Sequence, residues 1–312
     1  MAEVPQPPLR HLLTLDDLDA PALHNILDTA AALRSQQSFA PPEHSRTLLN
    51  LFFENSTRTR FSFEFAAARL GLRVLNFDVE GSSITKGESL RDTLQTLRAM
   101  RPDIVVIRHS SSGAAAYAAE VMGEAVAVIN AGDGFHAHPT QALLDLMTIR
   151  DHRGGFDGLA LAIVGDVRHS RVARSLLQGL RVLGVADLRL IGPATLLPSH
   201  PEALGARNFT DLAEGLAGVE VIIALRLQNE RMLGASLLPS AEEYRQGYGL
   251  DHERLGWAAP GAFVLHPGPI NRGVEISSQL ADSERSLILR QVENGVWVRM
   301  AVMQMLLGGD AA

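Results

Sequence analysis

Short apolar runs alternate with helix-like segments along nearly the whole chain, and this alternation is the feature that most constrains the fold. In the first half, four apolar runs read as buried strands: RTLLNLFF (46–53), LRVLNFD (72–78), PDIVVIR (102–108) and AVAVINAG (125–132). Helical periodicity follows each of them, over 57–70, 89–100, 112–122 and 138–150. Buried strands joined by helices form parallel sheets that are covered on both faces. The sequence therefore predicts a doubly wound α/β fold.

The pattern restarts after a polar, glycine-rich stretch, RDHRGGFDG (150–158), which we interpret as a hinge. Further strands are predicted over 159–166, 187–192, 219–226 and 261–268. The segment 227–258 has no clear period and is interpreted as loop-rich, and the chain ends in a long apolar helix. We therefore expect two doubly wound parallel-sheet domains joined by a hinge. Their expected bounds are 1–150 for the first domain, 151–287 for the second, and 288–312 for a C-terminal helix that returns to the first.

The overall charge is negative, which limits the classes of partner. The 312 residues include 28 Lys plus Arg against 35 Asp plus Glu, a formal charge of −7. A general nucleic-acid binder is more often basic, so we expect no nucleic-acid partner, and any anion must be met by local arginine clusters. No cysteine is present, which excludes disulfides and thiol chemistry. No run approaches 18 apolar residues and the start resembles no signal peptide, so we expect a cytoplasmic protein that does not bind membranes.

Polar and cationic residues follow the apolar runs, where open α/β sheets bind their ligands. The most informative group is Ser-Thr-Arg-Thr-Arg at 56–60, which separates a predicted strand from a predicted helix. A helix N-terminus with hydroxyl groups and a forked cation suits phosphate, and Ser56 is a good N-cap. The alternative is a capped helix with solvated arginines. Five successive polar residues between two apolar segments favour the phosphate site.

Nucleotide and metal motifs are absent or weak. The pattern G-x-x-x-x-G-K-[ST] does not occur, and no G-x-G-x-x-G follows a predicted strand, so a nicotinamide cofactor is not expected. His136 and His138 form an H-x-H pair, which can bind a metal, but no second cluster with ligand spacing follows. We therefore expect neither a cofactor nor a metal.

Together these motifs resemble the aspartate and ornithine carbamoyltransferase family, over about residues 10 to 308. Ser-Thr-Arg-Thr-Arg at 56–60 is similar to the family's carbamoyl phosphate motif, and His-Pro-Thr-Gln at 138–141 is similar to its second motif. The lysine-bearing loop GSSITKGE (81–88) and the R-x-Q-x-E-R segment from Arg226 resemble the aspartate branch.

A third feature also resembles the aspartate branch. His-Pro-Gly-Pro at 266–269 stands where the ornithine branch carries a cysteine-containing motif, and Gly268 replaces a more familiar leucine. An ornithine site would need acidic groups to meet a cationic side chain, whereas the loop after Arg226 begins basic.

The resemblance implies transfer of the carbamoyl group of carbamoyl phosphate to the α-amine of L-aspartate, an early step of pyrimidine biosynthesis. It assigns carbamoyl phosphate to Ser56, Thr57, Arg58, Thr59, Arg108, His138, Gln141, Gly268 and Pro269, and aspartate to Lys86, Arg171, Arg226 and Gln228. Thr59, Arg108 and His138 are expected to donate to the carbonyl oxygen. Arg58, the fourth expected catalytic residue, holds the departing phosphate.

The resemblance also implies an assembly, either a homotrimer or a multiple of trimers. Ser82 and Lys86 are then expected to complete the site of a neighbouring subunit, and Glu54 and Arg231 to take part in domain closure. Whether a regulatory chain or a dihydroorotase-like partner binds is left open. Two alternatives also stay open: a carbamoyltransferase for another amine, and a non-catalytic scaffold subunit. The scaffold would require missing phosphate or carbamoyl residues, and none is missing.

Overall fold

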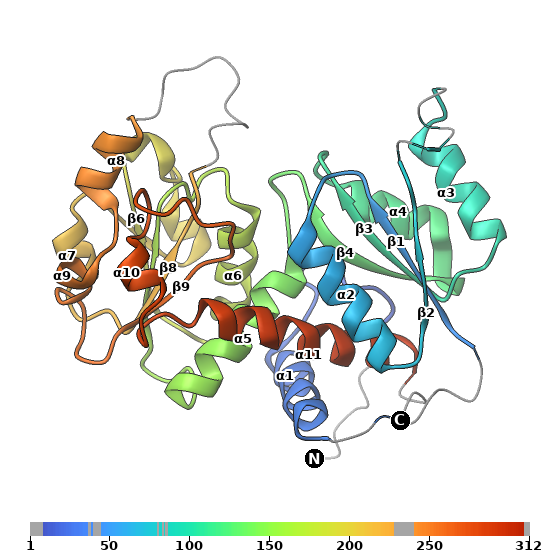
Figure 1. The fold of residues 1–312 in the computed structure, drawn as a ribbon, viewed down its shortest axis with the longest axis horizontal. Coiled ribbons are helices and arrows are strands. Elements are labelled where there is room, and N and C mark those ends of the chain that lie inside the picture. The colour runs from blue at the N-terminus through green and yellow to red at the C-terminus, as the bar shows by residue number, and fades with distance from the viewer. Residues whose placement is uncertain are drawn as a thin grey trace. The chain divides into compact units, whose positions relative to one another are not determined.

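The chain folds into two compact units (Figure 1), Met1–Thr140 with Asn294–Ala312 and Gln141–Glu293. The computed structural model describes residues 9–36, 39, 45–79, 81–82, 84, 87–227 and 240–308. Each unit is built on one parallel sheet with helices, so the predicted α/β class is confirmed. The finer domain bounds expected from the sequence stay a prediction.

The first unit contains a four-stranded sheet in the order β2-β1-β3-β4. Its strands are β1 (Thr47–Phe52), β2 (Arg73–Asn76), β3 (Ile104–His109) and β4 (Ala127–Asp133). Every neighbouring pair is parallel. The chain passes from β1 outward to β2 and then returns to β3 on the other side of β1. The direction of winding therefore reverses between β1 and β3.

Helices cover both faces of this sheet. They are α1 (Ala20–Ser35), α2 (Thr57–Arg69), α3 (Leu90–Ala99) and α4 (Ala114–Met122), with a short 3-10 helix η2 (Gly123–Ala125). Leu49 and Val105 pack with residues of α3 and α4 in one apolar cluster. Their chain neighbours Leu48 and Ile104 are also fully buried. Because successive side chains of a strand point to opposite faces, both faces of the sheet are covered.

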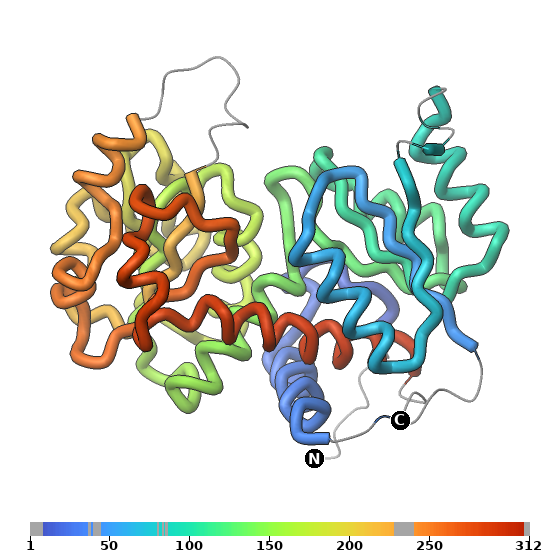
Figure 2. Tube along the Cα trace, in the orientation of Figure 1, coloured from blue at the N-terminus to red at the C-terminus, as the bar shows by residue number. Residues whose placement is uncertain are grey.

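Two helices carry the chain between the units. Helix α5 (Pro139–Arg153) begins in the first unit, and α11 (Ile288–Leu306) ends there. In Figure 2, α11 crosses beside α1, where Arg34 Nη1 donates to Asn294 Oδ1 at 3.0 Å. The buried guanidinium of Arg299 lies 4.9 Å from the ring centre of Phe63 on α2. The expected return of the C-terminal helix to the first unit is thus confirmed.

The second unit contains a five-stranded parallel sheet in the order β7-β6-β5-β8-β9. Its strands are β5 (Ala160–Val164), β6 (Asp187–Ile191), β7 (Arg207–Phe209), β8 (Val221–Ala224) and β9 (Phe263–Leu265). The chain winds from β5 through β6 to β7, then crosses to β8 and β9 on the other side. The winding therefore reverses between β5 and β8.

Short helices connect these strands. They are α6 (Arg171–Val182), α7 (Leu212–Leu216), α8 (Ala241–Tyr248), α9 (His252–Leu255) and α10 (Ser278–Ala281), with the 3-10 helices η3 (Ala194–Leu196) and η4 (Pro201–Leu204). Within the described ranges, no helix combines the length and the apolar character needed to cross a membrane.

The prediction of a loop over 227–258 is wrong for its second part, which contains α8 and α9; residues 228–239 lie outside the described residues. The overlooked signal is a capping box. The Ser240 hydroxyl accepts from the Glu243 amide at 3.1 Å, and the Glu243 carboxylate accepts from the Ser240 amide at 2.7 Å. Strand β7 is only three residues long and is not predicted from the sequence. The predicted hinge begins inside α5.

Candidate active site

The two points where the winding reverses coincide with the residues singled out by the sequence. Open α/β sheets bind ligands beyond the carboxyl ends of their strands, at the point where the strand order reverses. In the first unit, β1 leads into residues 54–60 and β3 ends at 108–109. In the second unit, β5 leads into 165–171 and β8 into 225–227. Strand order and residue chemistry therefore indicate the same edge of each sheet.

The Ser-Thr-Arg-Thr group forms the start of α2. Ser56 stands at the N-cap with an extended backbone, as predicted, but its hydroxyl makes no capping hydrogen bond. Thr57 and Arg58 are exposed, and Thr59 is buried. The first amides of a helix have no partner within the helix, and its N-terminus carries a partial positive charge. The Ser56 hydroxyl is thus not used to cap the start of the helix, which fits a site for an anion.

Arg108 is held at the end of β3 by two neighbouring strands. Its Nη1 donates to the carbonyl of Ala131 in β4 at 2.9 Å, and its Nε lies 3.5 Å from Glu54 Oε2, just after β1. The two side chains are only 13% and 21% exposed, so water screens their attraction little. Glu54, expected to act in domain closure, therefore contacts Arg108 within its own unit. Arg231, its expected counterpart, lies outside the described residues.

His138 directly precedes α5 and is buried. The turn before it is fixed by the buried carboxylate of Asp133, which accepts from the amides of Gly113 at 2.7 Å and Ala137 at 3.1 Å. The ring of His136 also contacts this carboxylate, with Nδ1 3.0 Å from Oδ2. His136 therefore serves the turn, and within the described part of the chain no group of three His, Cys, Asp or Glu could hold a metal.

His109 follows Arg108 and is kept as a neutral imidazole. The Ser111 amide donates to its Nδ1 at 2.9 Å, which requires that nitrogen to carry no proton. Burial lowers the pKa of His109 below its ordinary value of 6.5, against the opposing effect of the charges of Glu54 and Asp133. The edge of the sheet thus gains no positive charge from this residue near neutral pH.

In the second unit, two arginines leave the ends of adjacent strands. Arg171 is the first residue of α6 and is buried, and the Ser170 hydroxyl caps that helix by accepting from the Ala173 amide at 3.1 Å. Arg226 follows β8, which pairs in register with β5 from Leu161 to Val164. The two strands therefore end level with each other, and Arg171 and Arg226 emerge at the same edge.

The loop after β9 emerges beside Arg226, because β8 and β9 are also neighbours. Within it, the Gly268 amide donates to His266 Nδ1 at 2.7 Å. The φ of Gly268 is +66°, in the left-handed region that glycine adopts without steric cost. The peptide bond from Gly268 to Pro269 is cis. The predicted residues Gly268 and Pro269 thus lie at the same sheet edge as the two arginines.

Lys86, Gln228 and Arg231 lie outside the described residues. Ser82 is described, and its hydroxyl donates to the carbonyl of Val79 at 2.7 Å. The roles of these four residues stay predictions from the sequence.

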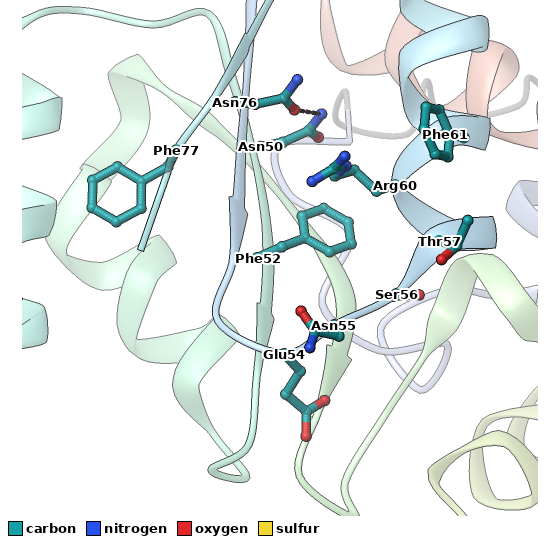
Figure 3. A pocket seen from close by; sticks show the side chains of 10 residues that line it. All are labelled: Asn50, Phe52, Glu54, Asn55, Ser56, Thr57, Arg60, Phe61, Asn76 and Phe77. Atoms are coloured by element: carbon teal, nitrogen blue, oxygen red, sulfur yellow. Dashed lines mark hydrogen bonds between the residues drawn. The ribbon is translucent and has the colours of Figure 1, made fainter. Parts of the chain in front are cut away.

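A hollow of about 400 Å³ opens beside the start of α2 (Figure 3). It is lined by Asn50, Phe52, Glu54, Asn55, Ser56, Thr57, Arg60, Phe61, Asn76 and Phe77. Arg60 points from α2 toward β1, and Asn50 Nδ2 donates to Asn76 Oδ1 at 2.9 Å. Arg58, Thr59, Arg108 and His138 are not part of its lining. Of the predicted ligands of carbamoyl phosphate, the hollow therefore includes Ser56 and Thr57 at the helix start but not these four.

Comparison with known proteins gives the same division of the chain. Residues 10–151 match the carbamoyl-P binding domain of the aspartate/ornithine carbamoyltransferases, and residues 157–306 match their Asp/Orn binding domain. Among solved structures, aspartate transcarbamoylase from Trypanosoma cruzi, in complex with carbamoyl aspartate and phosphate, is 30% identical over 98% of this chain and 99% of that chain, with a TM-score of 0.84.

Two further structures are similar to the same degree. The T. cruzi enzyme in complex with N-(phosphonacetyl)-L-aspartic acid is 30% identical over 96% of this chain and 98% of that chain, with a TM-score of 0.84. Ornithine carbamoyltransferase from Gloeobacter violaceus is 30% identical over 97% of this chain and 100% of that chain, with a TM-score of 0.81.

Proposed function

The chain belongs to the aspartate/ornithine carbamoyltransferase family, and on that premise we propose that it transfers the carbamoyl group of carbamoyl phosphate to the α-amine of L-aspartate. The products are N-carbamoyl-L-aspartate and phosphate, an early step of pyrimidine biosynthesis. The similar T. cruzi enzyme is seen with carbamoyl aspartate and phosphate, which correspond to these two products. The observation that carries the proposal is the pair Arg171 and Arg226 at the switch point of the second sheet.

The choice of aspartate over ornithine rests on charge. Both kinds of enzyme are among the similar structures, so overall similarity alone does not select the amine. Aspartate brings two carboxylates, and guanidinium groups bind carboxylates through paired, charge-assisted hydrogen bonds. Among the described residues directly after β5 and β8, the acidic one is Asp166. Its Oδ1 already accepts from the His169 amide at 3.2 Å and lies 2.9 Å from His169 Nδ1. Arg171, Arg226, Lys86 and Gln228 are therefore the proposed aspartate ligands.

Carbamoyl phosphate is bound through the first unit. The start of α2, with Ser56, Thr57 and Arg58, holds the phosphate group as it leaves. Thr59, Arg108 and His138 donate to the carbonyl oxygen, on which negative charge develops as the amine attacks. The contacts of Arg108 with Ala131 and Glu54 hold its guanidinium in place before the reaction, so little reorganisation is needed.

The carbamoyl NH₂ group donates hydrogen bonds to two sets of acceptors. Gln141 Nε2 is engaged by Asp145 Oδ1 at 3.0 Å, which leaves the amide oxygen of Gln141 to accept from the ligand. Backbone carbonyls near Gly268 and Pro269 are the second acceptors. The proton of the attacking amine passes to the departing phosphate, so no general base on the protein is required. Catalysis then comes from positioning and electrostatic stabilisation.

The proposed assembly is a homotrimer or a multiple of trimers, in the cytoplasm. Phe61 and Phe65 lie one turn apart on α2 and are 44% and 61% exposed, and Leu75 on the edge strand β2 is 42% exposed. Exposed apolar side chains of this size favour burial by a partner, and a neighbouring copy of the chain is the proposed partner. Ser82 and Lys86 follow β2 and complete that neighbour's site. Closure through Glu54 and Arg231 belongs to the same proposal.

The acceptor is tested with purified protein, carbamoyl phosphate, and either L-aspartate or L-ornithine. Formation of the ureido product is measured by colour development. Aspartate is expected to react at least about 100-fold faster, because ornithine lacks the side-chain carboxylate and leaves a guanidinium group without its partner. Loss of one partner of a desolvated charge pair typically costs about that much in rate. The variant Arg226→Ala should lose most of the aspartate rate. Faster turnover of ornithine would overturn the assignment.

A further inference from the structure

A chain of buried hydrogen bonds in the second unit connects the loop after β9 with Gln141. The His266 amide donates to Gln291 Oε1 at 2.8 Å, and Gln291 Nε2 donates to Asp145 Oδ1 at 2.7 Å. The same carboxylate oxygen accepts from Gln141 Nε2 at 3.0 Å. Asp145 is completely buried and Gln291 is 2% exposed, so water does not compete for these bonds.

The His266 amide determines which group donates and which accepts in each of these hydrogen bonds. A backbone N–H can only donate, so Gln291 must turn its carbonyl oxygen toward His266. Its NH₂ group then faces Asp145, and a carboxylate accepts there. An amide's nitrogen and oxygen are assigned from their partners, and here the fixed donor at His266 decides the orientation of each amide in turn. Gln141 must therefore present its NH₂ group to Asp145 and its oxygen in the other direction.

The orientation of Gln141 has a consequence for the ligand. We propose that Asp145 and Gln291 are positioning residues that keep the amide oxygen of Gln141 turned toward the substrate, so that the site selects a carbamoyl group over an isosteric acyl group. This inference rests on the proposed function, in which Gln141 accepts from the carbamoyl NH₂. An acetyl group has a methyl in place of the NH₂ and cannot donate to that oxygen. Selection then comes from one oriented acceptor.

The same carboxylate also restrains the second set of acceptors. The His266 amide is tied to Asp145 through Gln291, and the Gly268 amide donates to His266 Nδ1 at 2.7 Å. On its other side, His266 Nε2 lies 3.2 Å from the buried Glu275 Oε1. The loop with the proposed backbone acceptors is therefore held by the same buried chain that orients Gln141.

The test compares carbamoyl phosphate with acetyl phosphate, by calorimetry, in the whole protein. Asp145→Leu has a similar size but removes the oxygen that accepts from both glutamines, so the Gln141 amide is free to rotate. Gln291→Met keeps the length and removes both hydrogen bonds. In each variant, the ratio of the Kd for acetyl phosphate to the Kd for carbamoyl phosphate should fall about tenfold, the effect of one hydrogen bond. The Kd for inorganic phosphate should change less than about threefold, because its ligands lie on α2.

A matched control is Asp187→Leu in the same unit. Asp187 is the first residue of β6, at the amino end of the strand, and its carboxylate accepts from Arg189 at 2.7 Å and Arg207 at 2.9 Å. This variant loses comparable hydrogen bonds but should keep the wild-type ratio. An unchanged ratio in Gln291→Met or Asp145→Leu, or an equal fall in Asp187→Leu, would overturn the positioning role.

The two proposals fail in different ways. A wild-type protein that binds carbamoyl phosphate but does not carbamoylate aspartate would contradict the proposed function, and the Kd ratios would still decide the role of Asp145 and Gln291. Normal carbamoylation with an unchanged ratio in either variant would contradict the positioning role alone.

Discussion

Arg58 lies in the first turn of α2 and is exposed beside the Ser56 N-cap, where a helix start binds anions. Arg58→Ala should lower kcat by about 10²–10³, the usual effect of removing one donor from a developing negative charge. The measurement is steady-state turnover with saturating carbamoyl phosphate and aspartate. Far-UV circular dichroism of the same sample checks the fold.

A matched control comes from the other end of the same helix. Arg69 is in the last turn of α2, and its guanidinium lies 4.3 Å from the ring centre of Trp297. Arg69→Ala removes a cation–π contact worth roughly 0.5–1 kcal/mol of stability and should leave kcat within about twofold. If Arg58→Ala also keeps near-normal turnover, the stretch is only a capped helix with solvated arginines.

Two half-buried imidazoles make stability depend on pH. Val128 and Ser111 donate their amides to Nδ1 of His11 at 3.1 Å and of His109 at 2.9 Å. Burial lowers the pKa of both histidines below 6.5, with Arg10 adding to the effect at His11. Below pH 6.5 the unfolded chain therefore binds more protons than the folded chain. The free energy of unfolding should fall as the pH drops from about 6.5 toward 5 and should lose this dependence above about 7.

Asparagine separates titration from packing at these two positions. Asn Oδ1 accepts a backbone N–H much as the imidazole Nδ1 does but does not titrate. The double variant His11→Asn, His109→Asn should therefore show a flatter dependence of unfolding free energy on pH, measured by urea unfolding at several pH values. A slope equal to that of the wild type would show that other groups cause the acid sensitivity.

At the scale of elements, the sequence predicts what depends on local pattern. The apolar run 46–53 becomes β1 (Thr47–Phe52), because a strand buried on both faces needs nearly continuous apolar residues. The order of the strands is not predictable in this way. It depends on packing between segments far apart in the chain, and only that order shows where the winding reverses.

The residues of the candidate site are also predictable only where they depend on local sequence pattern. The rule that ligands bind at strand ends finds Arg108 and Arg171, since both follow obvious strands. It does not find Gln291, which contacts Asp145 across 146 positions of sequence from an apolar-looking helix. Capping at Ser240 was available from the sequence, but it stood inside a segment without a strong period.

The turn before His138 gives a prediction at this scale. Gly134 has a φ of +47°, and a Cβ on it would meet Ser112 Oγ and lie 2.5 Å from the Ser112 amide nitrogen. Gly134→Ala should therefore push the turn away from Ser112 and cost roughly 1–3 kcal/mol of stability. Because His138 follows four residues later, kcat should fall as well. Thermal unfolding and steady-state kinetics measure the two effects.

Gly218→Ala is the control for backbone strain alone. Gly218 has a φ of +76°, but nothing lies within 4 Å of a Cβ built on it. This variant should lose stability only through the left-handed backbone and should keep kcat. Equal effects of the two substitutions on kcat would mean that the contact between Gly134 and Ser112 does not position His138.

At the scale of the whole molecule, we expect each active site to be built from two chains. Phe61 and Leu75 expose apolar surface on α2 and on the edge strand β2, and the segment with Ser82 and Lys86 follows that edge. A head-to-tail contact between identical chains closes into a ring when its rotation fits. In a three-membered ring of this kind, each site would take Arg58 from one chain and Lys86 from the next.

Complementation tests the shared site. Arg58→Ala and Lys86→Ala are each expected to be nearly inactive, and the two variants are mixed, dissociated and reassembled. Every hybrid trimer then contains one site with both residues intact. With equal mixing, about three quarters of the trimers are hybrids, so activity should return to about a quarter of the wild-type value. Sedimentation velocity checks that trimers have reformed. If each site uses the Lys86 of its own chain, every site keeps one defect, and the reassembled mixture stays as inactive as the two parents.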